Sequence, residues 1–243
     1  MTNSRVWLIT GASRGIGRAV AERALSHGDR VVIIARGDAV NDLAKELGDN
    51  CIAAQADVSD SKAMLAVADK ALAKWGQIDV LVNNAGLHRG GRVSKLKEEN
   101  WQAVLDTNLT GALNGIRAVE PHMSEGAAII NIGAVVGFRG FAGDAAYAAS
   151  KAGLSGLTRA LAIEFAPRGI CVNLVIPGLV LTEMTEALSE SALESMRGII
   201  PLGRYGGAEE IAQVIHSVSE SRYMTGAFIP VDGGLMSSFG VPV

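Results

Sequence analysis

Short apolar runs alternate with amphipathic stretches along the chain, and this alternation restricts the possible folds more than any other feature. Several runs are apolar at nearly every position, which predicts strands that are covered on both faces, as in a parallel sheet. Strand–helix alternation predicts right-handed β-α-β units and a doubly wound, seven-stranded parallel α/β sheet in a three-layer αβα arrangement. The expected strands are Val6–Thr10, Val31–Ala35, Cys51–Ala56, Val80–Val82, Ala128–Ile132, Ile170–Val175 and Ala227–Val231, and the expected helices cover residues 15–27, 39–47, 61–75, 99–123, 147–165 and 208–217.

Length and composition favour a single domain over residues 1–243. Charged residues make up 19% of the chain and the net charge is −3, so no basic block supports nucleic-acid binding. No apolar run reaches the roughly 18 residues of a membrane span, and Met1–Arg5 lead into a strand without a secretory signal. Cys51 and Cys171 lie in apolar runs, which predicts buried free thiols. We expect a cytoplasmic protein.

The first strand runs directly into a glycine-rich turn, Thr10–Gly17, which opens the first helix. Glycines there let backbone N–H groups approach a pyrophosphate at the positive end of the helix. The spacing could belong to a mere turn, but its place after the first strand favours dinucleotide binding in a Rossmann-like fold. The predicted cofactor contacts in this turn are Gly11, Ser13, Arg14, Gly15, Ile16 and Gly17.

The end of the second strand indicates which dinucleotide binds. Arg36 stands where a carboxylate would accept hydrogen bonds from a free ribose 2′-hydroxyl, and Arg14 lies in the glycine turn. Two arginines without a carboxylate at that strand end fit a 2′-phosphate, although either one alone could simply face solvent. The sequence therefore predicts NADP(H) rather than NAD(H).

Two further strand ends add predicted cofactor contacts. Asp57 follows the third strand, where its carboxylate could accept from an adenine amino group. Asn83–Gly86 follow the fourth strand, and the small residues there let the backbone lie against the cofactor. Each segment could also be an ordinary turn at the end of a strand. The contacts predicted from them are Asp57, Val58, Asn84, Ala85 and Gly86.

Tyr147 and Lys151 lie four residues apart in an expected helix, so their side chains project from one face. A lysine ammonium beside a tyrosine favours the phenolate, and we expect it to lower the pKa of Tyr147 below about 10. Such a tyrosine can exchange a proton with an alcohol or a carbonyl. Alone, the spacing would more often mean a buried aromatic residue beside a solvated lysine, but the other motifs favour catalysis.

The same helix carries small or apolar residues on all sides, including Ala152, Leu157 and Ile163. One face must cover the sheet, and the opposite face is too apolar for water. We expect a helix of another subunit to cover that second face.

Together these motifs resemble the short-chain dehydrogenase/reductase family over essentially the whole chain. The narrower likeness is to the 3-oxoacyl-(acyl-carrier-protein) reductase group, through Asn131–Gly137 and Pro201–Arg204, although sugar, steroid and small-alcohol dehydrogenases share these motifs. The resemblance also implies a homotetramer. The residues that carry it are Thr10–Gly17, Asp57, Asn83–Gly86, Asn108, Tyr147, Lys151, Pro177, Gly178, Thr182 and Val231–Gly234.

The resemblance implies a role for each position. Tyr147 would protonate the carbonyl oxygen as hydride arrives, and Lys151 would hold the nicotinamide ribose. Asn108 would fix a kink in its helix and a water that connects Lys151 to solvent. Residues 182–200 would form a mobile lid over an apolar substrate pocket, unless they are an amphipathic surface helix. The remaining implied cofactor contacts are Pro177, Gly178, Val180 and Thr182.

Ala134 departs from the family pattern, which has a serine here that donates to the substrate oxygen beside the tyrosine. Alanine has no donor, whereas Asn108, Tyr147 and Lys151 are all present. We interpret Ala134 as a deliberate, inactivating Ser→Ala change that traps a substrate or product complex. The alternative is a natural variant that uses Tyr147 alone or has become a cofactor-dependent binding protein.

The expected activity is NADPH-dependent reduction of a ketone, with a 3-oxoacyl thioester as the expected substrate. A small-alcohol, steroid or sugar dehydrogenase and a catalytically silent NADP-binding protein are the alternatives. An acidic acyl carrier protein would need basic residues at the pocket rim; Arg168 and the basic run over Arg89–Lys97 favour this partner, whereas Glu125 opposes it. His88 and Arg89 could border the substrate or lie on the surface. No metal site is expected, because the histidines lack ligand spacing.

Overall fold

The computed structural model describes residues 4–181 and 190–238, and its seven strands form one sheet. All neighbouring strands pair in parallel, in the order β3-β2-β1-β4-β5-β6-β7. The chain winds outward in both directions from the central β1–β4 pair, which confirms the predicted doubly wound topology. The strands are β1 (Val6–Thr10), β2 (Arg30–Ala35), β3 (Cys51–Gln55), β4 (Val80–Asn83), β5 (Ala128–Ile132), β6 (Cys171–Pro177) and β7 (Phe228–Val231).

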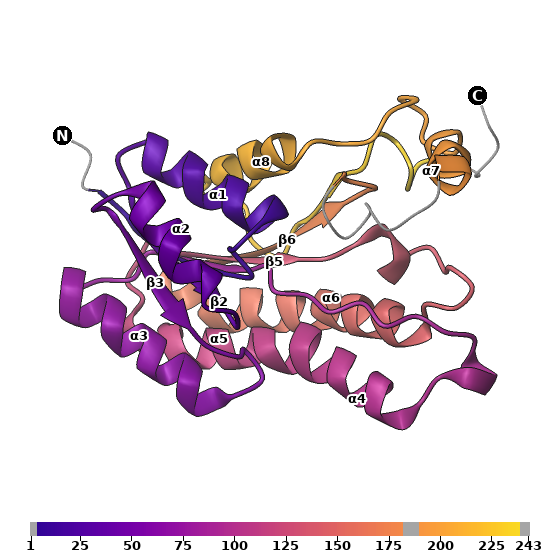
Figure 1. The fold of residues 1–243 in the computed structure, drawn as a ribbon. Coiled ribbons are helices and arrows are strands. Elements are labelled where there is room, and N and C mark those ends of the chain that lie inside the picture. Colours follow the sequence, from indigo (N-terminus) through magenta and orange to yellow (C-terminus); the bar gives the residue numbers. More distant parts are fainter. Residues whose placement is uncertain (1–3, 182–189, 239–243) are drawn as a thin grey trace.

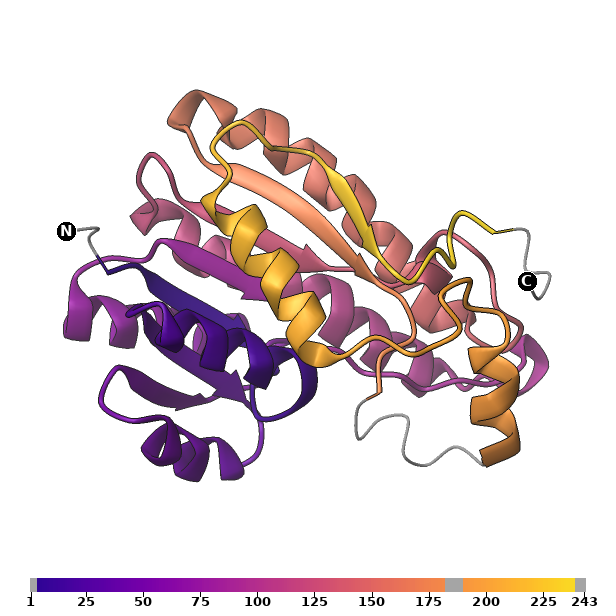
Figure 2. The same cartoon turned by 90° about the horizontal axis from the view of Figure 1, so that it is seen from above.

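Helices cover both faces of the sheet and complete the predicted three layers, as Figure 1 shows. One face carries α1 (Gly15–Ser26), α2 (Ala39–Leu47) and α8 (Ala208–Glu220). The other face carries α3 (Ser61–Trp75), α4 (Glu98–Leu105), α5 (Gly111–Val119) and α6 (Ala145–Phe165). By contrast, α7 (Glu190–Arg197) lies off the sheet, beyond the carboxyl ends of the strands (Figure 2).

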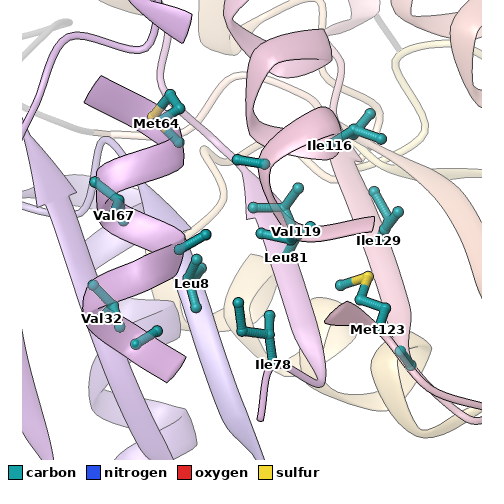
Figure 3. Close-up of a cluster of buried hydrophobic side chains, with 14 of the residues drawn as sticks. Leu8, Val32, Met64, Val67, Ile78, Leu81, Ile116, Val119, Met123 and Ile129 are labelled. Atoms are coloured by element: carbon teal, nitrogen blue, oxygen red, sulfur yellow. The ribbon is translucent and has the colours of Figure 1, made fainter. Parts of the chain in front are cut away.

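Alternate side chains of β1 enter two of the three apolar clusters among the described residues. Leu8 of β1 belongs to the cluster under α3 and α5, together with Met64 and Val119 (Figure 3). Its neighbours Trp7 and Ile9 belong to the cluster under α1, α2 and α8. Burial on both faces explains the continuous apolar runs of the strands, and it holds the strand ends in fixed positions.

The expected helix over residues 99–123 is divided in the structure. A π-helical turn, Asp106–Thr110, separates α4 from α5, and Glu120–His122 form a final 3-10 turn. Asn108, inside the π turn, is buried and directs its carboxamide to the loop after β4. A π turn places an additional residue in the helix and often marks a functional site. The irregularity expected at Asn108 is therefore present.

Cys51 and Cys171 are buried free thiols, as predicted, and burial raises the pKa of the Cys51 thiol to about 11. Within residues 4–181 and 190–238, no helix is long and apolar enough to cross a membrane, and no cluster of three or more His, Cys, Asp or Glu residues could hold a metal ion. The expected lid is described from Glu190, where α7 begins, whereas residues 182–189 lie outside the described ranges.

Candidate active site

The glycine turn after β1 needs its glycines for steric reasons. Gly11 and Gly15 have φ angles of 64° and 54°, which residues with a Cβ rarely adopt. Gly17 lies in α1, where a Cβ would come within 2.5 Å of the Gly11 carbonyl oxygen and 2.6 Å of Asn84 Nδ2. The turn therefore has no room for a side chain at this position, and it packs directly on the segment that follows β4.

Asn84 holds the glycine turn in place. Its Nδ2 donates to the carbonyl oxygens of Thr10 and Gly11, at 2.9 and 3.0 Å. The Thr10 hydroxyl in turn accepts from the backbone N–H groups of Asn84 and Ala85, both at 3.0 Å. Asn84 was predicted to lie against the cofactor, and its carboxamide binds the turn itself, with both donor hydrogens engaged.

The amino end of α1 has the properties of an anion site. Arg14 occupies the N-cap position in an extended conformation, and its side chain makes no capping hydrogen bond. The first backbone N–H groups of a helix have no partner inside the helix, and the helix dipole makes this end positive. The donors around Gly15 and Ile16, preceded by Ser13, therefore fit a pyrophosphate.

The ends of β2 and β3 bring Arg36 and Asp57 together. Arg36 Nη1 lies 4.0 Å from Asp57 Oδ2, and the two side chains are 61% and 43% exposed. Asp57 Oδ1 accepts from the Ser59 N–H and hydroxyl, at 2.9 and 2.7 Å. Partial burial acts to raise the pKa of Asp57, but the Ser59 hydrogen bonds and the Arg36 charge outweigh it, so the pKa is lowered. The Arg36 guanidinium remains accessible to a phosphate.

A buried hydrogen-bond chain links the π turn to α6. Asn108 Nδ2 donates to the Leu87 carbonyl at 3.0 Å and to the Ser150 hydroxyl at 2.9 Å, while its Oδ1 accepts from the Leu87 N–H at 2.7 Å. The Ser150 hydroxyl donates to the Tyr147 carbonyl at 2.7 Å. Ser150 carries no sequence signal, because a serine inside a helix is common, and its role depends on a partner in another helix.

Lys151 is 3% exposed and lies beside this chain. Its Nζ donates to the Ile132 carbonyl at the end of β5, at 2.7 Å. A Cβ on Gly86 would lie 3.8 Å from Lys151 Nζ and 3.9 Å from Asn108 Oδ1. The ammonium, the carboxamide and the segment after β4 therefore converge at the carboxyl edge of the sheet.

Tyr147 and Lys151 share a face of α6 as predicted, with Lys151 Nζ 5.7 Å from the centre of the Tyr147 ring. The prediction that the ammonium lowers the pKa of the phenol is wrong for this structure. Burial, followed by the charge of Asp144, raises the pKa of Tyr147 to about 12. Burial also lowers the pKa of Lys151 to about 8. Desolvation therefore outweighs the attraction of a cation at this distance.

Ala134 follows β5 at the same edge and precedes a 3-10 turn, Val135–Gly137. This turn packs on α6, because a Cβ on Gly137 would come within 3.0 Å of the Lys151 carbonyl carbon. Residue 134 thus lies at the end of the sheet that carries Tyr147 and Lys151, and it presents a methyl group there.

The loop after β6 reaches the same edge. Pro177 ends β6, and a Cβ on Gly178 would come within 2.6 Å of the Asp232 Cα. Val180 is buried in the core under α1, α2 and α8, and Thr182 lies outside the described residues. Val58, after β3, is likewise buried.

A cavity of about 480 Å³ lies beyond this loop. Tyr147 and Lys151 do not line it, so it is separate from the residues predicted to be catalytic. Its lining includes Leu179, Pro201, Leu202, Arg204, Ile211, Pro230 and Asp232.

His88 and Arg89 are both exposed in the loop after β4. His88 Nε2 lies 2.8 Å from Asp144 Oδ1, and the His88 ring meets the Tyr147 ring edge-on, with 5.1 Å between centroids. Arg89 Nη1 donates to Asn100 Oδ1 at 3.0 Å. His88 therefore belongs to the candidate site. Asp144 was not predicted, because its partner is 56 residues away in the sequence.

Arg168 lies far from these groups, in the 3-10 turn that precedes β6 at the amino edge of the sheet. Its Nη1 is 3.2 Å from Glu120 Oε1, and its Nη2 donates to the Glu120 carbonyl at 2.7 Å. Glu125 packs nearby, with Cγ 2.7 Å from a Cβ built on Gly169. Within one chain, Arg168 does not border the Tyr147 site, contrary to expectation, because α6 separates the two by its whole length.

The sheet order, the glycine turn beside the central strands and the open end of α1 define a dinucleotide-binding α/β protein. A family model described as enoyl-(acyl carrier protein) reductase matches residues 11–236. The chain belongs to the short-chain dehydrogenase/reductase family.

Known relatives match over nearly the whole chain. The 3-oxoacyl-[acyl-carrier-protein] reductase FabG of Staphylococcus aureus (strain Mu50) is 41% identical over 237 residues, covering 94% of this chain and 96% of the relative. FabG of Escherichia coli (strain K12) is 40% identical over 236 residues, covering 95% and 97%.

Solved structures agree with this family. A blue fluorescent protein from a metagenomic library, in complex with NADPH, has a TM-score of 0.91 and 34% identity, covering 96% of this chain and 98% of that chain. A double mutant of a Serratia marcescens short-chain dehydrogenase/reductase has a TM-score of 0.90 and 34% identity, with the same 96% and 98% coverage.

Proposed function

We propose that this protein reduces a ketone to the alcohol with NADPH, with a 3-oxoacyl thioester as substrate and Tyr147 as proton donor. The observation that carries the proposal is the convergence of Tyr147, Lys151, Asn108 and Ser150 beside the glycine turn. The relatives named 3-oxoacyl-[acyl-carrier-protein] reductase, 40% and 41% identical, support this substrate class.

The residues present fit NADP(H), which supplies the hydride from its nicotinamide ring. The amino end of α1 and the backbone of Gly11–Gly17 would hold the pyrophosphate. Arg36 would bind the 2′-phosphate, because its side chain is 61% exposed at the end of β2. Asp57, Ala85 and the loop from Pro177 would complete the contacts. The NADPH complex of a relative that is 34% identical supports this cofactor.

Tyr147 gives its hydroxyl proton to the carbonyl oxygen while hydride adds to the carbonyl carbon. A phenol with a pKa of about 12 is protonated at neutral pH, which is the form that a reductase needs. Lys151, with a pKa of about 8, is charged at pH 7 and stabilises the phenolate that forms. A water near Asn108 and Lys151 would return the proton from solvent.

Ala134 leaves the substrate oxygen with one donor fewer than a serine would supply. Removing such a donor typically slows a reaction by about 10²–10³-fold. We therefore propose that Ala134 is a Ser→Ala change that lowers turnover and spares cofactor binding. A catalytically silent NADP-binding protein is the second candidate function, and Ala134 is the observation that favours it.

The proposal has further parts, and the structure supports two of them, the subunit contact and the carrier protein. The chain would act as one domain, with residues 182–200 closing over the substrate. Ile163 of α6 is 78% exposed although apolar, which supports a helix contact between subunits in a homotetramer. The exposed basic run over Arg89–Lys97 lies in the loop that contains His88, and it supports an acyl carrier protein as partner. We also propose a cytoplasmic location.

Oxidation of NADPH in the presence of acetoacetyl-coenzyme A tests the proposed function. We expect slow turnover by the unmodified chain and at least about tenfold faster turnover by Ala134→Ser. NADPH affinity, measured by fluorescence titration, should be equal in both. A smaller gain would contradict the Ser→Ala hypothesis, and no turnover by Ala134→Ser with any 3-oxoacyl thioester, ketone or alcohol would favour the silent binding protein.

A further inference from the structure

His88 and Asp144 form an ion pair beside Tyr147 that the reaction described above does not use. His88 lies in the loop after β4, and Asp144 immediately precedes α6. Their side chains meet at 2.8 Å, from Nε2 to Oδ1. A second hydrogen bond, from the Gly91 N–H to the Gly143 carbonyl at 2.7 Å, joins the same two loops. Two independent contacts therefore hold these loops together over the phenol.

The imidazole touches the phenol itself. The His88 and Tyr147 rings meet at 81°, with 5.1 Å between their centroids. The Asp144 side chain is 16% exposed and the His88 side chain 40%, so the carboxylate is covered while the imidazole remains accessible. Gly90 lies against the pair, since a Cβ there would come within 3.2 Å of His88 Cε1 and 3.3 Å of Asp144 Oδ1. The pair is thus closely packed into the site.

One ring nitrogen remains for a ligand. A carboxylate only accepts hydrogen bonds, so the Nε2–H of His88 donates to Asp144. Within the part of the chain that the structure describes, His88 Nδ1 has no hydrogen-bond partner. In the protonated ring Nδ1 also carries a hydrogen. In that form the ring that contacts Tyr147 has a donor at Nδ1 that is not engaged by Asp144.

We propose that His88 is a catalytic residue, which in its protonated form donates from Nδ1 to the carbonyl oxygen of the substrate beside the Tyr147 hydroxyl, and that Asp144 positions the ring. This contact compensates in part for the hydroxyl that Ala134 lacks, so Ala134→Ser still increases turnover. The proposal rests on the function proposed above. The proposed step needs no further reactant. Hydride adds to the carbonyl carbon, Tyr147 gives the proton to the oxygen, and His88 keeps its own protons.

A double-mutant cycle with position 134 tests this role. His88→Phe removes both ring nitrogens but keeps an aromatic ring against Tyr147. If His88 supplies the missing donor, His88→Phe lowers kcat for acetoacetyl-coenzyme A at least about tenfold with Ala134 present. Two donors to the same oxygen can partly substitute for each other. In the Ala134→Ser background, His88→Phe should therefore lower kcat by less than about threefold. Equal losses in both backgrounds, or no loss in either, would overturn the proposal.

The matched control is His122→Phe, which changes an exposed imidazole in the 3-10 turn Glu120–His122, before β5 and away from the carboxyl edge. It should leave kcat unchanged in both backgrounds. Circular dichroism and melting temperature verify that each variant folds. A loss with His122→Phe equal to that with His88→Phe would contradict the proposed role.

Asp144→Asn tests the positioning role, because the amide keeps an acceptor oxygen and loses the charge. It should lower kcat when His88 is present and have no further effect in the His88→Phe background. A purely structural role would produce the same loss in both cases, and that result would overturn the assignment of Asp144.

Failure of the proposed function gives a different pattern, because Ala134→Ser would then show no turnover. In that event, calorimetric binding of acetoacetyl-coenzyme A in the presence of NADP+ measures the contact directly. At least about tenfold weaker binding by His88→Phe supports the contact, and unchanged binding refutes it.

Discussion

The glycine turn and the residues around Tyr147 lie at the same edge of the sheet, but they are built in opposite ways. In the turn, a Cβ on Gly17 would come within 2.5 Å of backbone, and the side-chain donors of Asn84 are engaged with the turn. Around Tyr147, burial raises the pKa of the phenol and lowers the pKa of the buried Lys151. The turn is thus stabilised by close packing, whereas the reacting region holds its ionisable groups at a cost in stability.

Tyr147→Phe should have the largest effect and act on chemistry alone. Loss of the general acid is expected to lower kcat by about 10²–10⁴-fold in the more active Ala134→Ser background. The free energy of unfolding should change little, because the ring and its packing remain. Tyr223→Phe changes a fully exposed phenol and is the control. Stopped-flow NADPH oxidation and urea denaturation measure the two quantities, and a parallel loss of stability would contradict the distinction between the regions.

The pH dependence of stability should reveal the cost of Lys151. Its pKa is about 8 in the folded protein and 10.5 ordinarily, so the unfolded chain binds more protons between these values. The free energy of unfolding therefore rises with pH through this window. Below about pH 8 the buried ammonium of Lys151 lowers that free energy by its full amount. Relative to Lys151→Met, the unmodified chain should gain about 2–3 kcal/mol between pH 7 and pH 10.

Urea denaturation of both proteins at the two pH values measures this difference. Lys62→Met, at an exposed lysine of α3, is the control and should show no comparable change. A constant difference between Lys151→Met and the unmodified chain would mean that burial of Lys151 carries no such cost.

Gly17→Ala tests whether close packing is what stabilises the glycine turn. Overpacking against Gly11 and Asn84 is expected to cost about 1–3 kcal/mol of unfolding free energy, and NADPH affinity should fall with it. Gly37→Ala adds the same methyl group where no atom lies within 4 Å, and it should be within about 0.5 kcal/mol of the unmodified chain. Equal effects of the two substitutions, measured by thermal denaturation, would refute close packing as the reason for glycine at 17.

Arg36→Ala should have the smallest effect and act on cofactor choice. Losing a charge-assisted contact to the 2′-phosphate is expected to lower the preference for NADPH over NADH by about tenfold. The kcat/KM for NADH should be nearly unchanged. Steady-state kinetics with both cofactors test this, and Arg92→Ala, in the exposed loop after β4, is the control. An unchanged preference would remove Arg36 from the cofactor site.

Sequence patterns predicted the fold well and the site in part. The seven strands and the doubly wound arrangement were predicted from apolar runs that alternate with helical segments, because burial on both faces leaves a local signal in the sequence. The π turn at Asp106–Thr110 interrupts an otherwise helical pattern, and the family resemblance at Asn108, not periodicity, predicted a kink there. The position of Arg168 was mispredicted: Tyr147 lies in the first turn of α6 and Arg168 follows its last, so the two residues lie at opposite edges of the sheet.

What the sequence alone determined is the order of elements, the glycine turn and the presence of Tyr147 and Lys151 on one helix face. These features follow from short-range sterics and periodicity. Tertiary structure decided that Asn84 binds the turn, that His88 meets Asp144 over Tyr147, and that the phenol has a raised pKa. Hydrogen bonding and desolvation depend on neighbours from distant parts of the chain, and no local pattern records them.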